Sequence, residues 1–157
     1  MVKIVDGDLL KASENIIAHQ VNCQGKMASG VAKSIRNNFP EVYEEYMNMY
    51  NLNNNKGCPS GELLGTAQIV DCRNKIVCNI FAQDTYGYDG KNYTDVNSLK
   101  RGLKELYTFA KENNYSAALP FKIGSCRGGA DWNEVYKIIE DIFNDDVLLT
   151  LYRLDLN

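Results

Sequence analysis

Two glycine-bearing segments of this chain have the composition and spacing to hold phosphate groups. Residues 22–30 follow an apolar run of strand length and lead directly into a predicted helix, and residues 123–131 have the same form. Backbone N–H groups at the start of a helix lack partners within the helix, and the helix dipole places positive charge there. Such loops bind phosphate, so two of them at one edge of a sheet could share the charge of a diphosphate.

The glycines have a second explanation, because ordinary strand-to-helix turns also need their backbone freedom. One such loop would favour that explanation, whereas two of the same form favour a ligand. Two familiar nucleotide motifs do not match. Gly25 and Gly30 have the spacing of a P-loop, but Val31 and Ala32 stand where Lys and Ser or Thr are required. The dinucleotide fingerprint G-x-G-x-x-G is absent from both loops.

The elements around these loops predict one α/β domain. Strands are predicted over residues 2–5, 16–21, 67–71, 76–82, 116–120 and 147–152. Helices are predicted from Ser29 to about Phe39, over 41–50, from Thr94 or Asp95 onward and from Asp131 onward, with loops over 51–62 and 83–93. In open α/β sheets, ligands bind beyond the carboxyl ends of the strands, where such loops gather.

The composition is that of a globular domain, with 157 residues, 45% of them hydrophobic and 24% charged. A net charge of −3 provides no basic surface for a nucleic-acid backbone. Five cysteines without a C-x-x-C pair, and a single histidine, predict free thiols and no metal site. The first residues do not resemble a signal peptide, and no segment has the length of a membrane span. We therefore expect a cytoplasmic protein without a membrane or nucleic-acid partner.

Several motifs, taken together and in order, resemble those of the macrodomain family of ADP-ribose-binding modules. They lie at residues 7–10, 22–32, 64–65, 119–132 and 151–154. Within the family, the chain looks most similar to the branch that contains the yeast ADP-ribose 1″-phosphate phosphatase and the human terminal ADP-ribose glycohydrolase. The resemblance covers nearly the whole chain. It implies a single macrodomain over residues 1–157, with a three-layer α/β/α fold and a central six-stranded mixed sheet.

The resemblance also implies which residues bind the ligand. Asp8 would accept a hydrogen bond from the adenine amino group, with the Leu9 backbone beside it and Tyr152 or Leu154 nearby. A carboxylate is only an acceptor, which suits an exocyclic amine, although Asp8 could equally cap a turn. The residues implied at the distal ribose and one phosphate are Asn22, Gly25, Met27, Ala28, Ser29, Gly30 and Val31. Those implied at the diphosphate are Ile123, Gly124, Ser125, Cys126, Arg127, Gly128 and Gly129.

His19 and Lys91 are the candidate catalytic residues. His19 lies at the end of a predicted buried strand, where a core histidine satisfied by hydrogen bonds is the alternative interpretation. The phosphatase-like relatives carry a histidine there, which implies a general acid or base, or a phosphate contact. Lys91 roughly matches the nucleophilic lysine of the glycohydrolase relative, with a solvated surface lysine as the alternative. The catalytic aspartate of that relative falls on Gly128, and Asp131 is more simply the cap of the next helix.

We therefore predict a hydrolase, without a cofactor, that removes a 1″-phosphate or an ester-linked ADP-ribose from an acidic side chain. The glycine at position 128 leaves open a non-catalytic module that binds ADP-ribose. A binder of another nucleotide metabolite on the same scaffold is a third alternative. The expected partners are ADP-ribose, its derivatives or an ADP-ribosylated protein, and the expected oligomeric state is a monomer.

Overall fold

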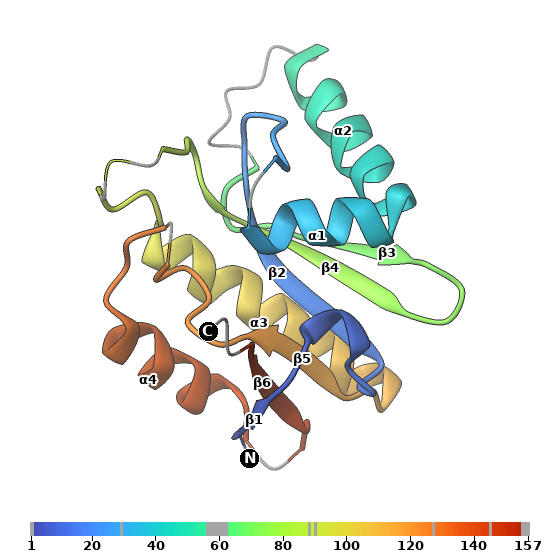
Figure 1. Cartoon of the computed structure of the whole chain (residues 1–157), viewed down its shortest axis with the longest axis vertical. Coiled ribbons are helices and arrows are strands. Elements are labelled where there is room, and N and C mark those ends of the chain that lie inside the picture. The colour runs from blue at the N-terminus through green and yellow to red at the C-terminus, as the bar shows by residue number, and fades with distance from the viewer. Residues whose placement is uncertain are drawn as a thin grey trace.

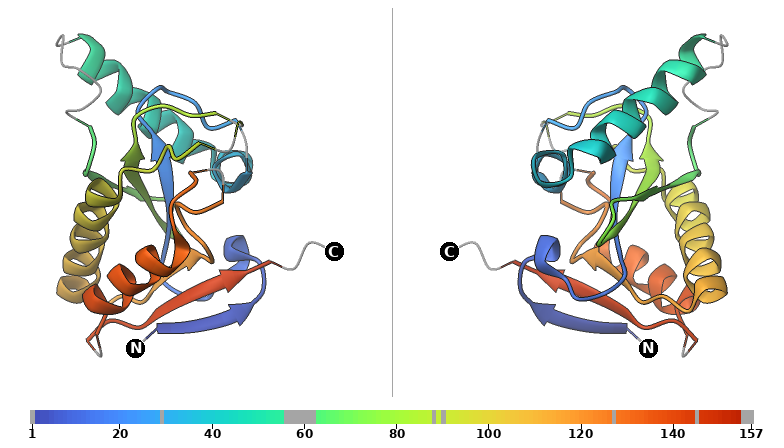
Figure 2. Two further views of the ribbon diagram at one scale, coloured as in Figure 1. Left: turned by 90° about the vertical axis from the view of Figure 1, so that its left-hand side faces the viewer. Right: turned by 90° about the vertical axis from the view of Figure 1, so that its right-hand side faces the viewer.

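A computed structural model of the chain describes residues 2–28, 30–55, 63–87, 89, 91–126, 128–144 and 146–154. A six-stranded sheet lies between helices on both of its faces (Figures 1 and 2). Its strands are β1 (Val2–Asp6), β2 (Ile16–Asn22), β3 (Ala67–Asp71), β4 (Ile76–Gln83), β5 (Ala117–Pro120) and β6 (Leu149–Arg153). The helices are a 3₁₀ turn η1 (Leu9–Lys11), α1 (Gly30–Asn38), α2 (Pro40–Asn55), α3 (Val96–Asn113) and α4 (Trp132–Ile142).

The strands follow the order β1-β6-β5-β2-β4-β3, which makes β2 an interior strand between β5 and β4. Neighbouring strands are parallel except for the antiparallel pair β3 and β4. The prediction of an α/β fold with a six-stranded mixed sheet is therefore confirmed. Because β2, β4 and β5 are parallel, their carboxyl ends share one edge, and the loops that follow them leave the sheet together.

The two faces of the sheet bury separate apolar cores. Alternate residues of a strand point to opposite faces, so Ile16 and Ala18 pack with α3 and α4, whereas Ile17 and Val21 pack with the side of α1 and α2. Figure 2 shows α3 and α4 on one side of the sheet and α1 on the other. The sheet is therefore covered on both sides, as the near-continuous apolar run of β2 indicated.

The predicted helix boundaries hold with one exception. Asp95 and Asp131 cap α3 and α4 by accepting hydrogen bonds from the backbone N–H groups of Ser98 and Asn133. The predicted loop over 51–62 is wrong for residues 51–55, because α2 continues to Asn55. Asparagine disfavours a helix by only a few tenths of a kcal/mol, and α2 is already anchored by packing. Residues 56–62 lie outside the described residues.

None of the described helices is long and apolar enough to cross a membrane.

Candidate functional site

Three loops meet at the carboxyl edge of the central strands. We call them the first glycine loop (residues 23–29, after β2), the tyrosine loop (84–95, after β4) and the second glycine loop (123–130, after β5). The Cys23 N–H lies 3.0 Å from the Gln83 carbonyl oxygen and 3.2 Å from that of Asp84, which joins the first glycine loop to the start of the tyrosine loop. Figure 2 shows the described parts of these loops at one end of the sheet.

The first glycine loop is shaped by the side chain of Asn22, at the end of β2. Its amide donates to the Lys26 carbonyl at 2.9 Å, and its oxygen accepts from the Gln24 N–H at 3.0 Å. The Tyr46 hydroxyl of α2 donates to the Asn22 carbonyl and side-chain oxygens at 2.7 and 2.9 Å. Asn22 is 8% exposed and Tyr46 is fully buried. The Asn22 amide therefore holds the loop through contacts within the chain.

This loop offers backbone more than side chains to a ligand. Gly25 has φ +75°, and a Cβ there would lie 3.0 Å from the Tyr50 ring, so the turn requires glycine. Met27 is 1% exposed and packs in the core, whereas Ala28 and Val31 are exposed. Gly30 begins α1, whose N-terminus therefore opens toward the loop edge. Ser29 lies outside the described residues.

The second glycine loop turns through residues with positive φ, among them Gly124 at +76° and Gly129 at +74°. Ile123 anchors it in the core at 3% exposure, while Cys126 is exposed. The Ser125 hydroxyl is buried and has no hydrogen-bond partner among the described residues. Arg127 lies outside the described residues. The loop therefore begins and ends at buried residues, Ile123 and Ala130.

The residues implied at the adenine lie together at the ends of β1 and β6. One Asp8 oxygen accepts from the Leu10 N–H at 3.0 Å and caps η1, and Leu9 is a core residue at 7% exposure. A Cβ on Gly7 would lie 3.5 Å from the Tyr152 ring, so the ring and the Asp8 segment are neighbours. Leu154 is 55% exposed.

Tyr152 is held by a carboxylate that the sequence did not indicate. Its hydroxyl donates to Glu14 Oε1 at 2.6 Å, and the Thr150 hydroxyl donates to Glu14 Oε2 at 3.0 Å. Partial burial and the bond to the Glu14 carboxylate raise the pKa of Tyr152 above its usual value. Glu14 is 8% exposed, so it fixes the direction of the Tyr152 ring from inside the protein.

His19 lies within β2, with 1% of its surface exposed. Its Nε2 atom is 2.5 Å from Asn79 Oδ1, across the β2–β4 pair, so Nε2 carries the proton. Burial lowers the pKa of His19 to about 4, against the opposing effect of the Asn79 bond. Nδ1 is buried and has no partner among the described residues. The imidazole is therefore neutral near pH 7.

Lys91 lies in the tyrosine loop, with its side chain 77% exposed. Its ammonium is 3.7 Å from Asp89 Oδ2, and its backbone N–H donates to Asp89 Oδ1 at 3.1 Å. The Tyr93 hydroxyl donates to the same carboxylate at 2.7 Å, and this bond holds the pKa of Asp89 below its usual range. Unlike His19, Lys91 can reach a ligand from solvent.

Sequence reasoning missed the side chains that hold these loops. Gln20 is a polar residue inside an apolar strand run, which is a local signal of a buried hydrogen bond. Tyr46, Glu14 and Thr94 carry no such signal, because their partners lie far along the chain.

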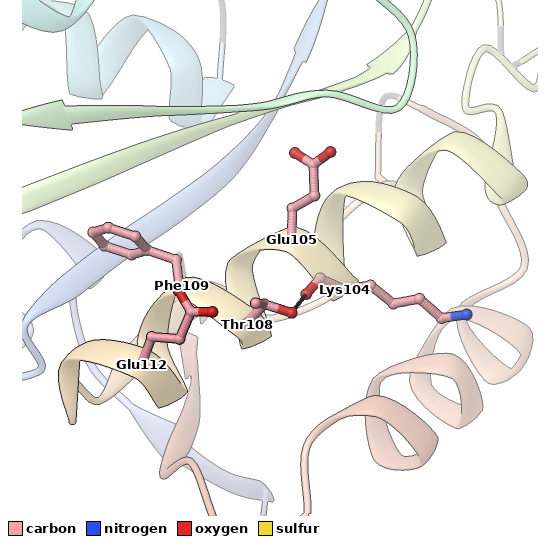
Figure 3. A pocket seen from close by; sticks show the side chains of 5 residues that line it. All are labelled: Lys104, Glu105, Thr108, Phe109 and Glu112. Atoms are coloured by element: carbon pink, nitrogen blue, oxygen red, sulfur yellow. Dashed lines mark hydrogen bonds between the residues drawn. The ribbon is translucent and has the colours of Figure 1, made fainter.

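A hollow of about 330 Å³ on α3 is separate from the loops (Figure 3). It is lined by Lys104, Glu105, Thr108, Phe109 and Glu112. These residues occupy the second half of α3, whereas the first turn of α3 adjoins the tyrosine loop. In Figure 3 the Thr108 hydroxyl donates to the Lys104 carbonyl of the same helix.

Comparisons with known proteins agree with this geometry. The family model described as Macro domain matches residues 18–139. A DNA ADP-ribosyl glycohydrolase of Mycobacterium tuberculosis is 27% identical over 160 residues, which cover 97% of this chain and 42% of that protein. An ADP-ribose 1″-phosphate phosphatase of Scheffersomyces stipitis is 37% identical over 76 residues, covering 45% of this chain and 42% of that protein. The structure of the Mycobacterium tuberculosis DarG macrodomain superposes with a TM-score of 0.81 at 26% identity, covering 97% of each chain. This chain spans less than half the length of the Mycobacterium tuberculosis relative.

Proposed function

The chain belongs to the Macro domain family, and from this premise we propose that it is a hydrolase that binds ADP-ribose derivatives at its three loops. Its substrate is ADP-ribose 1″-phosphate, or ADP-ribose linked as an ester to an acidic side chain. Water replaces the phosphate or the carboxylate and leaves ADP-ribose as the product. The names of the curated relatives support this substrate class, because they describe a phosphatase and glycohydrolases of ADP-ribose compounds.

The observation that carries the proposal is the meeting of two glycine loops at the ends of adjacent strands, β2 and β5. A diphosphate needs several hydrogen-bond donors, and the backbone of both loops and the start of α1 can provide them. The chain has a net charge of −3, so local donors rather than a general positive field must attract the anion. Because both loops are held by internal hydrogen bonds, binding requires little ordering.

We assign the adenine to Asp8, the Leu9 backbone, Tyr152 and Leu154, the distal ribose to the first glycine loop, and the diphosphate to the second. The loops orient the substrate and stabilise charge while water attacks. Lys91 is the candidate catalytic side chain that can reach a ligand. If Lys91 has a chemical role, Lys91→Ala should lower turnover and leave the affinity for ADP-ribose unchanged. If Lys91 is a solvated surface lysine, the variant should change neither.

Calorimetry with ADP-ribose tests the binding site. Gly124→Ala places a Cβ at φ +76° and 3.1 Å from Gln20 Oε1, and should weaken binding at least tenfold. Gly65→Ala is the control for backbone strain, because Gly65 has φ +86° and a Cβ there would meet the flexible Arg101 side chain of α3, which belongs to none of the three loops. Both variants introduce a similar backbone strain of roughly 1–2 kcal/mol. Absence of binding by the unmodified chain at millimolar ADP-ribose refutes the proposal.

Incubation with ADP-ribose 1″-phosphate and with a glutamate-ADP-ribosylated protein tests the reaction. Release of phosphate, or of ADP-ribose, supports a hydrolase and identifies the linkage that is broken. Tight binding of ADP-ribose without turnover of either compound supports instead a module that only recognises ADP-ribose.

DNA-linked ADP-ribose is a second candidate substrate. It is favoured by the similarity to DNA ADP-ribosyl glycohydrolases over 97% of this chain. The net charge of −3 predicts that the DNA backbone itself contributes little affinity. Binding of an ADP-ribosylated oligonucleotide should therefore depend on salt no more steeply than binding of free ADP-ribose.

We also propose a cytoplasmic location and a monomeric state. The four described cysteines are free, and two of them, Cys23 and Cys78, are buried thiols that fit a reducing compartment. Fractionation of cells and light scattering in solution test these two proposals separately.

A further inference from the structure

A network of partly buried hydrogen bonds around Thr94, which we call the Thr94 knot, joins the tyrosine loop to the second glycine loop. The Thr94 hydroxyl donates to the Gly124 carbonyl at 2.8 Å and accepts from Gln20 Nε2 at the same distance. Gln20 Nε2 also donates to Gln83 Oε1 at 2.7 Å. Thr94 is 6% exposed. One hydroxyl therefore links β2, the tyrosine loop and the second glycine loop.

The backbone around Thr94 closes the same junction. The N–H groups of Tyr93 and Thr94 donate to the Gly128 carbonyl at 2.7 and 3.0 Å. A Cβ on Gly129 would lie 2.6 Å from the Lys91 carbonyl oxygen, so the two loops are in direct backbone contact. The start and the end of the second glycine loop are thus both fastened to residues 91–94.

The knot fills the space that a side chain at position 128 would need. A Cβ on Gly128 would lie 2.1 Å from the Thr94 hydroxyl oxygen, 2.5 Å from the Gly124 carbonyl oxygen and 3.0 Å from Gln20 Nε2. All three of these neighbours belong to the hydrogen-bonded knot itself. The Thr94 knot and a side chain at position 128 therefore exclude one another.

We infer that Thr94 is a positioning residue, whose hydroxyl fixes the second glycine loop in the conformation that receives the anionic part of the ligand. Thr94 contacts no reacting group, and it acts through the carbonyl groups of Gly124 and Gly128. The inference rests on the proposed ADP-ribose function for its effect on binding, and on the structure alone for its effect on the loop. Because the loop is held rather than mobile, its donors need no ordering when the ligand arrives.

The test compares Thr94→Val, which keeps the shape and removes the hydroxyl, with Thr94→Ser, which keeps the hydroxyl. Thr108→Val is the matched control, since among the described residues the Thr108 hydroxyl bonds to the Lys104 carbonyl of the same helix, at the exposed hollow of Figure 3. The measurements are ADP-ribose affinity by calorimetry, kcat and KM for the substrate that is turned over, and amide hydrogen exchange of the described residues in 123–130.

We expect Thr94→Val to raise the Kd and the KM about tenfold, to change kcat less than threefold and to speed exchange in the second glycine loop. Thr94→Ser and Thr108→Val should stay within twofold of the unmodified chain in all of these. Unchanged exchange and affinity in Thr94→Val overturn the inference. Equal losses in Thr94→Val and Thr94→Ser also overturn it, because the hydroxyl would then not be responsible.

Two further outcomes are informative. If Thr94→Val does not fold, Gly128→Ala displaces the same knot from the other side and should weaken binding with faster exchange; normal binding by this variant overturns the inference. If the unmodified chain has no affinity for ADP-ribose, the proposed function fails. Hydrogen exchange in Thr94→Val then still decides whether Thr94 holds the loop.

Discussion

Replacing Asn22 by alanine should loosen the first glycine loop. The change removes the bond from the Asn22 amide to the Lys26 carbonyl and the bonds that Asn22 Oδ1 accepts from the Gln24 N–H, the Lys26 N–H and the Tyr46 hydroxyl. The Tyr46 hydroxyl keeps its bond to the Asn22 carbonyl at 2.7 Å and to the Lys26 N–H at 3.1 Å. The loop thus loses its side-chain support but keeps its attachment to α2.

The size of the effect follows from these bonds. The Tyr46 hydroxyl and the Lys26 N–H keep another partner, so the loss comes mainly from the bonds to the Lys26 carbonyl and the Gln24 N–H. These two partly buried bonds contribute about 1 kcal/mol each, so Asn22→Ala should lower the free energy of unfolding by about 2 kcal/mol. For a chain of this length that corresponds to a fall in Tm of roughly 4–8 °C. Tyr46→Phe removes the hydroxyl that donates to the Asn22 carbonyl and accepts from the Lys26 N–H, and it should lower the free energy of unfolding by a similar amount, about 2 kcal/mol.

A double-mutant cycle tests whether Asn22 and Tyr46 act on one loop. Since they share a hydrogen bond, the double variant should be more stable than the sum of the single losses predicts, by about 1 kcal/mol. Urea unfolding measures stability, and calorimetry measures the affinity for ADP-ribose, which should fall about tenfold if reordering the loop requires about 1.4 kcal/mol. Tyr107→Phe, at an exposed hydroxyl on α3, should change neither by much. Additive losses, or normal affinity in a destabilised Asn22→Ala, would refute the reasoning.

Three other predictions concern buried groups near the site. His19 has a pKa of about 4 in the folded protein against an ordinary value of 6.5, so the unfolded chain binds the proton more readily and stability falls as the pH drops through this range. In His19→Asn, the free energy of unfolding measured with urea should therefore vary less between pH 4 and 6.5, by up to about 3 kcal/mol. The same pH dependence in this variant would contradict the burial argument. Tyr152→Phe removes a bond to the Glu14 carboxylate and should lower the free energy of unfolding by about 2 kcal/mol and weaken ADP-ribose binding. Glu14→Gln keeps an acceptor and should have the smaller effect. The reverse order of the two effects would show that the carboxylate does not hold the Tyr152 ring. Gly128→Asp should be less stable than the unmodified chain and no faster in turnover, because its Cβ would meet the Thr94 hydroxyl. Faster hydrolysis by this variant would show that the hydrogen bonds around Thr94 can rearrange to admit a carboxylate.

The sequence predicted the layers and the loops because both depend on local patterns. The apolar run of β2 indicated an interior strand, and the aspartates before α3 and α4 indicated where those helices begin. The one wrong boundary, at residues 51–55, arose because asparagine disfavours a helix only weakly and packing elsewhere in α2 decided the outcome. The positions of the two glycine loops at one edge followed from the parallel order of β5, β2 and β4.

The supports of the loops could not be predicted in the same way, because each joins residues that are distant along the chain. Asn22 and Tyr46 are 24 positions apart, Gln20 and Thr94 are 74 apart, and Glu14 and Tyr152 are 138 apart. Burying such polar groups stabilises the fold only when the partners meet, and leaves unsatisfied groups when they do not. Each pair also lies behind a different segment of the proposed site: the distal ribose, the diphosphate and the adenine. Loss of one support should therefore weaken recognition of one part of the ligand. The affinities of each variant for ADP, ADP-ribose and ribose 5-phosphate should distinguish the three pairs, because the affinity falls for the compounds that contain the affected part.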